Sequence, residues 1–167
     1  MKLFLLRHGI AENQNPLYFP EDSKRPLTEK GKKEVRKVAQ KMRDLEFKID
    51  LILSSPFVRA KQTAEIAAEM YKKSPLEFSE HLACGGSAGA LMKELKTRYQ
   101  KRENILIVGH EPYLSNLASV LISGKPIANI DLKKAGLIVL KVDEELRLGP
   151  CATLKLFISP KYFLQIG

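Results

Sequence analysis

The sequence predicts an α/β protein with three layers, in which a mixed, mainly parallel sheet is flanked by helices. Short apolar runs recur along the chain, and the first of them are followed by segments with helical spacing of apolar residues. A run that is apolar throughout is typical of a strand buried on both faces, and a repeated order of strand and helix implies crossovers between parallel strands. The length of 167 residues favours a single domain over residues 1–167.

The first half of the chain contains two strand-then-helix units. Residues 3–6 form the first predicted strand, and Thr28 is the expected cap of the helix that follows. The apolar residues of that helix recur at helical spacing, at Val35, Val38, Met42 and Leu45. Residues 49–53 predict the next strand. We expect Ser55 to cap the second helix, with Pro56 at its first position.

The second half continues this order and then changes. Residues 76–78 predict a minor strand, residues 87–100 a third helix, and residues 105–108 another fully apolar strand. The helix after that strand is expected to end at Gly124, since glycine is the usual helix terminator. Residues 136–159 read as strands around polar turns. We expect these last strands to join the sheet at an edge.

Composition narrows the function classes. No apolar run approaches the roughly 20 residues of a membrane span, and no secretory signal is recognisable, so we expect a cytoplasmic protein without membrane contact. Cys84 and Cys151 form no C-x-x-C pair, and we interpret both as small apolar fillers. The net charge of +9 fits either anionic partners or simple solubility. Nucleic acid is disfavoured because aromatic residues are few and no nucleic-acid motif occurs.

Polar residues follow three of the predicted strands where each strand ends. Arg7 and His8 follow the first, His110 follows the strand at 105–108, and Arg59 lies one turn into the helix after Ser54 and Ser55. Parallel strands place their carboxyl ends at one edge, where ligands bind in open α/β sheets. Guanidinium groups match phosphate oxygens, and a neutral imidazole can act as nucleophile, acid or base. The sequence therefore predicts a phosphate site.

Other phosphate chemistries lack their residues. A cysteine phosphatase needs an arginine six residues after its cysteine, where Ala90 and Phe157 stand. The glycines near Gly85 lack the Lys-Ser/Thr pair of a nucleotide-binding loop. The three histidines also lack the spacing of a zinc site. We therefore expect chemistry without a metal or an organic cofactor.

Several motifs together carry a resemblance to a known family. They are R-H-G at residues 7–9, R-P-L-T-x-x-G at 25–31, S-S-P-x-x-R-A-x-Q-T at 54–63, and G-H-E-P at 109–112. In this order they resemble the histidine phosphatase superfamily, and the short chain and the R-P-L-T segment resemble its SixA-type phosphohistidine phosphatases. The resemblance implies a phosphoglycerate mutase-like fold, consistent with the reading above.

The resemblance also implies roles for individual residues. His8 would be the nucleophile that accepts the phosphoryl group, and Arg7 and Arg59 would bind the phosphate oxygens. His110 would stabilise the transferring group by hydrogen bonding. Arg25 would be an additional anion contact of the SixA-like branch. These roles imply a phosphatase that works through a covalent phosphohistidine intermediate.

The chain departs from the family at the leaving-group acid. Many members carry a dedicated acidic residue, and Glu80, beside His81, is the candidate here, although the surrounding motif does not fit. A positioned acid contributes roughly 10²–10⁴-fold for a strongly basic leaving group. A phosphohistidine leaves as an imidazole, which needs less help. The expected substrate is therefore a phosphohistidine on a phosphotransfer or phosphocarrier protein. Small phosphate esters, hydrolysed or isomerised, and a non-enzymatic anion-binding module are the alternatives, while the physiological substrate and the oligomeric state are open.

Overall fold

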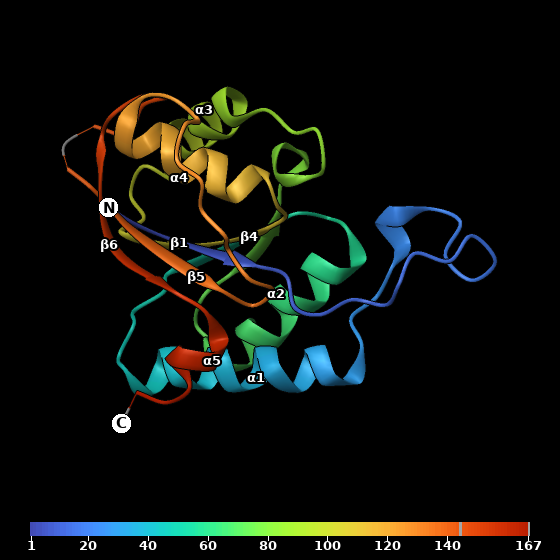
Figure 1. Cartoon of the computed structure of the whole chain (residues 1–167). Helices are drawn as coiled ribbons and strands as arrows, with labels where there is room; N and C mark the ends of the chain where they lie inside the picture. The colour runs from blue at the N-terminus through green and yellow to red at the C-terminus, as the bar shows by residue number, and fades with distance from the viewer. Residues whose placement is uncertain (144, 167) are drawn as a thin grey trace.

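The computed structural model describes residues 1–143 and 145–166. Its strands are β1 (Lys2–Arg7), β2 (Leu51–Ser54), β3 (Leu76–Phe78), β4 (Asn104–Gly109), β5 (Leu137–Val142) and β6 (Ala152–Ile158). They form one sheet in the order β3-β2-β4-β1-β5-β6 (Figure 1). The first four strands are parallel, while β5 is antiparallel to β1 and β6 to β5. The predicted mixed, mainly parallel sheet is confirmed, with its antiparallel strands at one end.

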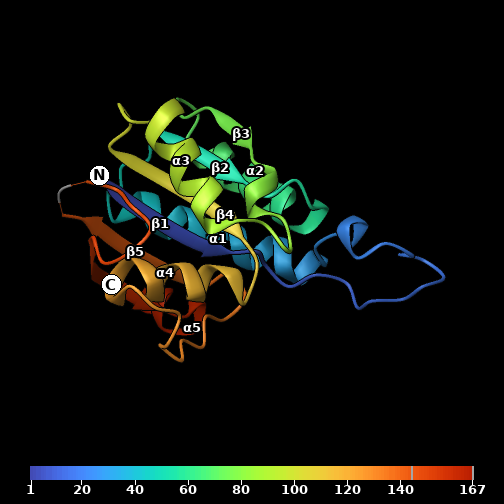
Figure 2. The same ribbon diagram turned by 90° about the horizontal axis from the view of Figure 1, so that it is seen from above.

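Helices cover both faces of the sheet and complete the three layers. The helices are α1 (Glu29–Asp44), α2 (Val58–Met70), α3 (Ala88–Arg98), α4 (Tyr113–Ser123) and the short α5 (Pro160–Phe163). Helices α1, α2 and α5 pack on one face, and α3 and α4 on the other (Figures 1 and 2). Two single turns of 3-10 helix, η1 (Asp22–Lys24) and η2 (Glu80–Leu82), lie in the connections.

The apolar runs are continuous because the central strands have no solvent-facing side. Along β1, Leu3 and Leu5 belong to the core beneath α3 and α4, whereas Phe4 and Leu6 belong to the core beneath α1 and α2. Successive side chains of a strand point to opposite faces, so a strand covered twice needs apolar residues at every position. The interpretation of residues 3–6 and 105–108 as fully buried strands is confirmed.

Two of the three helix ends predicted from the sequence are confirmed. The hydroxyl of Thr28 accepts a hydrogen bond from the Gly31 amide at the start of α1, and Gly124 ends α4 with a φ of 83°. The expectation for α2 was wrong. Its cap is Phe57 and its first residue Val58, so Pro56 lies outside the helix. The Ser55 hydroxyl contacts the ring of His110, as described below.

None of the helices in the described part of the chain combines the length and the apolar character that crossing a bilayer requires.

The carboxyl ends of β1, β2 and β4 open toward the segment that projects from the body of the molecule in Figures 1 and 2. That edge is where the polar strand ends come together.

Candidate active site

Three strand ends meet because β4 lies between β1 and β2. In the register of the sheet Arg7 is opposite Gly109, and Val108 is opposite Ser54. The pairing continues past the strands, since the His8 amide donates to the Gly109 carbonyl. The imidazole rings of His8 and His110 consequently lie with their centroids 5.2 Å apart. The predicted convergence of two imidazoles at one edge is confirmed.

The hydrogen bonds of His8 determine which of its nitrogens carries the proton. Its Nδ1 lies 2.7 Å from the carbonyl oxygen of Gly9, which can only accept, so Nδ1 is the donor. Nε2 of the neutral ring is then the acceptor, and Arg59 Nε donates to it at 3.2 Å. Burial, aided by the charges of His110, Arg59 and Arg7, lowers the pKa of His8 to about 3. At neutral pH, His8 therefore presents an unprotonated Nε2, the form that a nucleophile requires.

His110 is the second buried imidazole, only 2% exposed. Its Nε2 lies 2.8 Å from the Ser55 hydroxyl, and its ring meets that of Phe57 edge-on at 5.2 Å between centroids. Burial and the charge of Arg59 lower the pKa of His110 to about 4, so this ring is also neutral at pH 7. Its buried Nδ1 has no hydrogen-bond partner among the described residues.

The expected cap residue Ser55 precedes α2 without capping it, and its hydroxyl accepts from the Phe57 amide at 3.3 Å. The hydroxyls of Ser54 and Ser55 have different partners. The hydroxyl of Ser54 donates to the Ser55 carbonyl, whereas the hydroxyl of Ser55 bonds His110. The side chains of neighbouring residues leave a strand in opposite directions, so only one of the two can face the imidazoles.

Arg59 occupies the centre of the cluster and is held on several sides. Besides its bond to His8, it donates from Nη1 to the carbonyl oxygen of Asp22 at 2.7 Å and from Nη2 to the Asp22 carboxylate at 2.8 Å. Its guanidinium also lies over the Phe57 ring, 5.4 Å from the centroid. Arg59 is only 4% exposed, so these contacts hold its charge beside the His8 imidazole.

Asp22 is a site residue that the sequence reasoning missed. It lies in η1, in a polar loop where no periodicity or motif distinguishes it. Burial alone would raise its pKa, but the hydrogen bonds from Arg59 and Arg25 outweigh burial and hold the pKa of Asp22 below its usual value. The carboxylate is therefore ionised at neutral pH. It orients Arg59 and is a poor proton donor.

Arg7 lies at the end of β1 on the other side of His8. Its Nη1 donates to the Leu132 carbonyl at 2.8 Å, while its buried Nε has no partner among the described residues. Burial lowers the pKa of Arg7, and the charges of Glu111 and Asp131 oppose that effect. A half-buried guanidinium with an unused donor is suited to an anion.

Arg25 and Glu80, the other two predicted site residues, have different positions. Arg25 is bound to the Asp22 carboxylate through Nε and Nη2, and its Nη1 donates to the Glu12 carbonyl at 2.8 Å. Glu80 is exposed in the first turn of η2, and its carboxylate takes part in none of the hydrogen bonds or ion pairs of the described residues. Arg25 is therefore connected to the cluster through Asp22. No hydrogen bond or ion pair of the described residues connects the Glu80 carboxylate to the cluster. Both roles stay predictions.

Cys84 corrects a further expectation. It is exposed rather than a buried filler, and its Sγ lies 3.9 Å from Nη2 of Arg59, because the loop after η2 borders the cluster. Cys151, in contrast, is buried as expected. In residues 1–143 and 145–166, no three side chains of His, Cys, Asp or Glu gather closely enough to hold a metal ion.

The motif residues between the charged ones tie the segments together. Thr63 accepts from the Gly9 amide at 3.1 Å, and Gln62 accepts from the Leu27 amide at 2.7 Å. A Cβ on Gly31 would lie 2.1 Å from the Ile10 carbonyl oxygen, so only glycine lets α1 approach the segment after His8. These contacts were not foreseen, although the Gly, Gln and Thr belong to the motifs quoted above.

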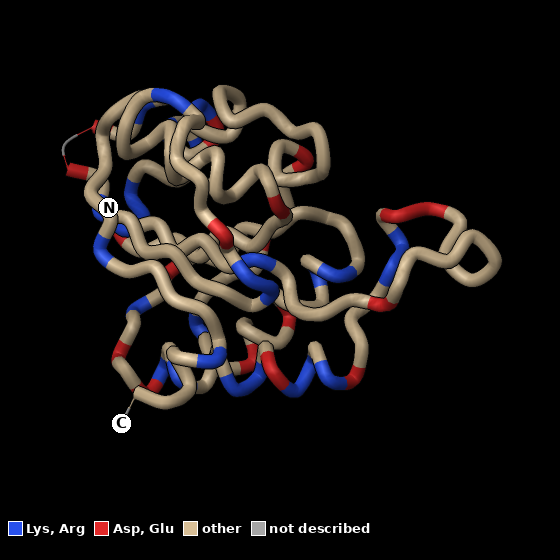
Figure 3. Tube along the Cα trace, in the orientation of Figure 1, with Lys and Arg blue, Asp and Glu red and all other residues tan. Residues whose placement is uncertain are grey.

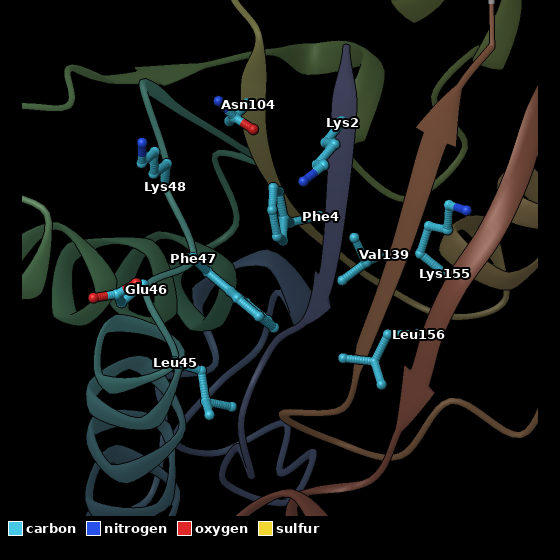
Figure 4. A pocket seen from close by; sticks show the side chains of 10 residues that line it. All are labelled: Lys2, Phe4, Leu45, Glu46, Phe47, Lys48, Asn104, Val139, Lys155 and Leu156. Carbon is cyan, nitrogen blue, oxygen red and sulfur yellow. The ribbon is translucent and has the colours of Figure 1, made fainter.

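The cluster does not coincide with the pocket drawn in Figure 4. That cavity, about 730 Å³, lies at the opposite edge of the sheet, between the loop after α1 and strands β1, β5 and β6. Its lining mixes apolar side chains with lysines, Glu46 and Asn104, and it contains no histidine or arginine. Figure 3 shows Lys and Arg spread over the whole chain, with a run along α1, so net charge alone does not locate the site either. The candidate site is therefore located by its residues, the two imidazoles and the guanidinium groups beside them.

Two neutral imidazoles beside buried guanidiniums, at the carboxyl edge of a mainly parallel sheet, define an enzyme of phosphoryl transfer. The comparisons agree. A family model of the histidine phosphatase superfamily (branch 1) matches residues 3–83. An uncharacterized protein of Picosynechococcus sp. is 36% identical over 168 residues, covering 98% of this chain and 99% of that protein. The phosphohistidine phosphatase SixA of Escherichia coli is 30% identical over 146 residues, covering 81% of this chain and 88% of SixA.

The fold comparison gives the same answer. A structure of the protein histidine phosphatase SixA complexed with tungstate superimposes with a TM-score of 0.81 at 25% identity, covering 97% of this chain and 99% of that one. The chain belongs to the histidine phosphatase superfamily, in its SixA-type branch. The resemblance inferred from the motifs is confirmed.

Proposed function

We propose that this protein is a phosphohistidine phosphatase that removes the phosphoryl group from a histidine of a phosphorylated protein. The observation that carries the proposal is the unprotonated Nε2 of His8 beside the guanidinium of Arg59. The name of the Escherichia coli relative, phosphohistidine phosphatase, supports the substrate class.

The reaction has two steps. The lone pair of His8 Nε2 attacks phosphorus, a new P–N bond forms, and the P–N bond to the substrate imidazole breaks; that imidazole leaves with a proton taken from solvent. Water then attacks the phosphorus of phospho-His8, the P–N bond to Nε2 breaks, and a proton of the water returns to solvent, so that inorganic phosphate is released and the neutral ring is restored. Both steps go through a covalent intermediate that divides the barrier.

Positioning and charge supply most of the catalysis. Arg7 and Arg59 bind the equatorial oxygens of the phosphoryl group, and the neutral ring of His110 donates one hydrogen bond to them. The unpartnered donor of Arg7 and the unpartnered Nδ1 of His110 support these roles, because each has a bond to offer a bound anion. Arg25 contributes through Asp22, whose orientation it fixes.

The substrate class follows from the leaving group. Asp22 is the carboxylate bonded to Arg59, and its lowered pKa makes it a poor acid at neutral pH. Glu80 is the other candidate acid, and a role for it requires the loop at η2 to bring it to the substrate. An imidazole leaves with little assistance, since its conjugate acid has a pKa of about 6.5, whereas an alkoxide of a phosphate ester does not.

The test compares a peptide or protein carrying phosphohistidine with a phosphoserine peptide. We expect kcat/KM to favour phosphohistidine by about 100-fold or more, the size of the missing acid contribution. His8→Ala is expected to abolish turnover and the acid-labile phosphoenzyme, and His81→Ala, in a loop outside the cluster, serves as its control. Equal or faster hydrolysis of phosphoserine would favour the alternative of a phosphate-ester enzyme. Retained turnover by His8→Ala would refute the assignment of His8 as the nucleophile.

A further inference from the structure

A projecting segment begins at the active site and is not explained by the chemistry. Residues 12–25, called the arm, extend away from the body of the molecule in two perpendicular views (Figures 1 and 2). The root of the arm is closed by hydrogen bonds from the Glu12 amide to the Pro26 carbonyl and from Arg25 to the Glu12 carbonyl. Asp22, within the arm, is bound to Arg59, so the root is part of the catalytic cluster.

The tip of the arm has its own local structure. The amide of Leu17 donates to the Asn15 side chain at 2.9 Å, and the amides of Tyr18 and Phe19 donate to the Asn15 carbonyl. This turn directs two large side chains outward, with Leu17 89% and Tyr18 77% exposed. Residues 13–20 carry no charge, and the tip is uncoloured in Figure 3. An ordered turn that exposes neighbouring apolar side chains is typical of an interaction site.

A second surface borders the cluster through Arg7. A groove of about 620 Å³ is lined by Arg7, Lys133, Lys134 and Lys161 against the acids Glu34 and Asp131. Lys133 is paired with Asp131, whereas Lys134 is exposed and has no ion-pair partner in the described chain. The groove therefore carries a surplus of positive charge, and Arg7 joins it to the cluster.

We propose that the arm and the groove dock the phosphorylated protein, a proposal that rests on the proposed function. A small phosphorylated molecule bound at His8 has no atoms that reach the tip of an arm projecting from the body. A protein whose phosphohistidine reaches His8 must lie against the surfaces around it. The partner that fits presents an apolar patch to Leu17 and Tyr18 and carboxylates to Lys134. Apolar burial supplies affinity, and the lysines supply orientation and association rate.

The experiment measures two substrates with each variant. One substrate is free phosphohistidine. The other is a phosphocarrier protein whose histidine has been phosphorylated chemically, with phosphoramidate as the reagent. In the double variant Leu17→Ser with Tyr18→Ser, we expect KM for the protein to rise about tenfold or more, the value of burying one or two such side chains. We expect kcat/KM for free phosphohistidine to be unchanged, which also verifies the fold. Lys134→Glu is expected to raise KM for the protein and to weaken its salt dependence.

Leu154→Ser is the matched control. Leu154 is 45% exposed on β6, where it pairs with Leu140 opposite the start of β1, away from the catalytic edge. We expect both substrates to be processed by this variant as by the wild type. The docking proposal is overturned if the arm variant keeps its KM for the protein, if it loses activity on both substrates alike, or if sedimentation shows that it has lost a dimer instead. If the wild type cleaves neither of the two substrates, the proposed function itself is refuted, and the docking proposal is refuted together with it.

Discussion

Replacing His8 with glutamine is expected to make the stability of the protein less sensitive to acid. Burial, together with the neighbouring charges, lowers the pKa of His8 to about 3, whereas an imidazole in an unfolded chain has a pKa of about 6.5. Between these values the unfolded chain binds more protons than the folded protein. The free energy of unfolding therefore falls as the pH falls through this window, and it is unaffected by His8 well above pH 6.5.

The two pKa values give the magnitude. Between pH 7 and pH 5, the proton taken up by the unfolded chain at His8 lowers the free energy of unfolding by about 2 kcal/mol. His110, with a pKa of about 4, contributes a similar amount. Glutamine at position 8 does not titrate, so the variant is expected to lose about 2 kcal/mol less than the wild type over this range, whatever its absolute stability.

Urea unfolding followed by circular dichroism at pH 5, 6 and 7 measures the difference. His81→Gln removes an imidazole from a loop outside the cluster and is expected to keep most of the wild-type dependence. If His8→Gln loses as much stability between pH 7 and pH 5 as the wild type, His8 is not held neutral by the fold. The nucleophile would then need another source of activation.

Two further substitutions test the contacts that shape the site. Ser55→Ala removes the 2.8 Å bond to His110 and is expected to lower kcat about fivefold with little change in KM, because a lost hydrogen bond costs about 1 kcal/mol and this one orients the ring proposed to act on the transferring phosphoryl. An unchanged kcat would show that the bond is incidental. Gly31→Ala places a Cβ 2.1 Å from the Ile10 carbonyl oxygen and is expected to destabilise the protein by about 1–3 kcal/mol in thermal unfolding. Gly89→Ala, in α3 with its nearest neighbour at 3.7 Å, is the control and is expected to stabilise slightly; equal melting temperatures of the two variants would contradict the packing argument.

Much of the architecture was predictable because it depends on local patterns. The central residues of β1 and β4, 3–6 and 105–108, are all apolar, which follows from burial on both faces, and Gly124 ends α4 in the left-handed conformation that glycine favours. Once three strands are known to be parallel, their carboxyl ends share an edge. The meeting of His8, His110 and Arg59 therefore required no knowledge of side-chain packing.

The errors occurred where tertiary contacts compete with local preference. Ser55 followed by Pro56 is a good helix start by propensity, yet the helix begins at Val58 and the Ser55 hydroxyl bonds His110 instead. Cys84 was interpreted as a buried filler, but the loop that carries it lies exposed beside Arg59. Asp22 gave no signal, because its importance comes from Arg59, which lies 37 positions away in the chain.

The amino-acid sequence by itself determined the order of strands and helices, the edge at which the polar strand ends meet, and the motifs that mark the histidine phosphatase superfamily. These depend on residue types and their spacing along the chain. The tertiary structure alone decided which serine meets His110, that both imidazoles are neutral, and that an apolar-tipped arm extends from the cluster around Arg59. Such properties depend on burial and on contacts between distant segments, and the energies of those contacts exist only after the chain has folded.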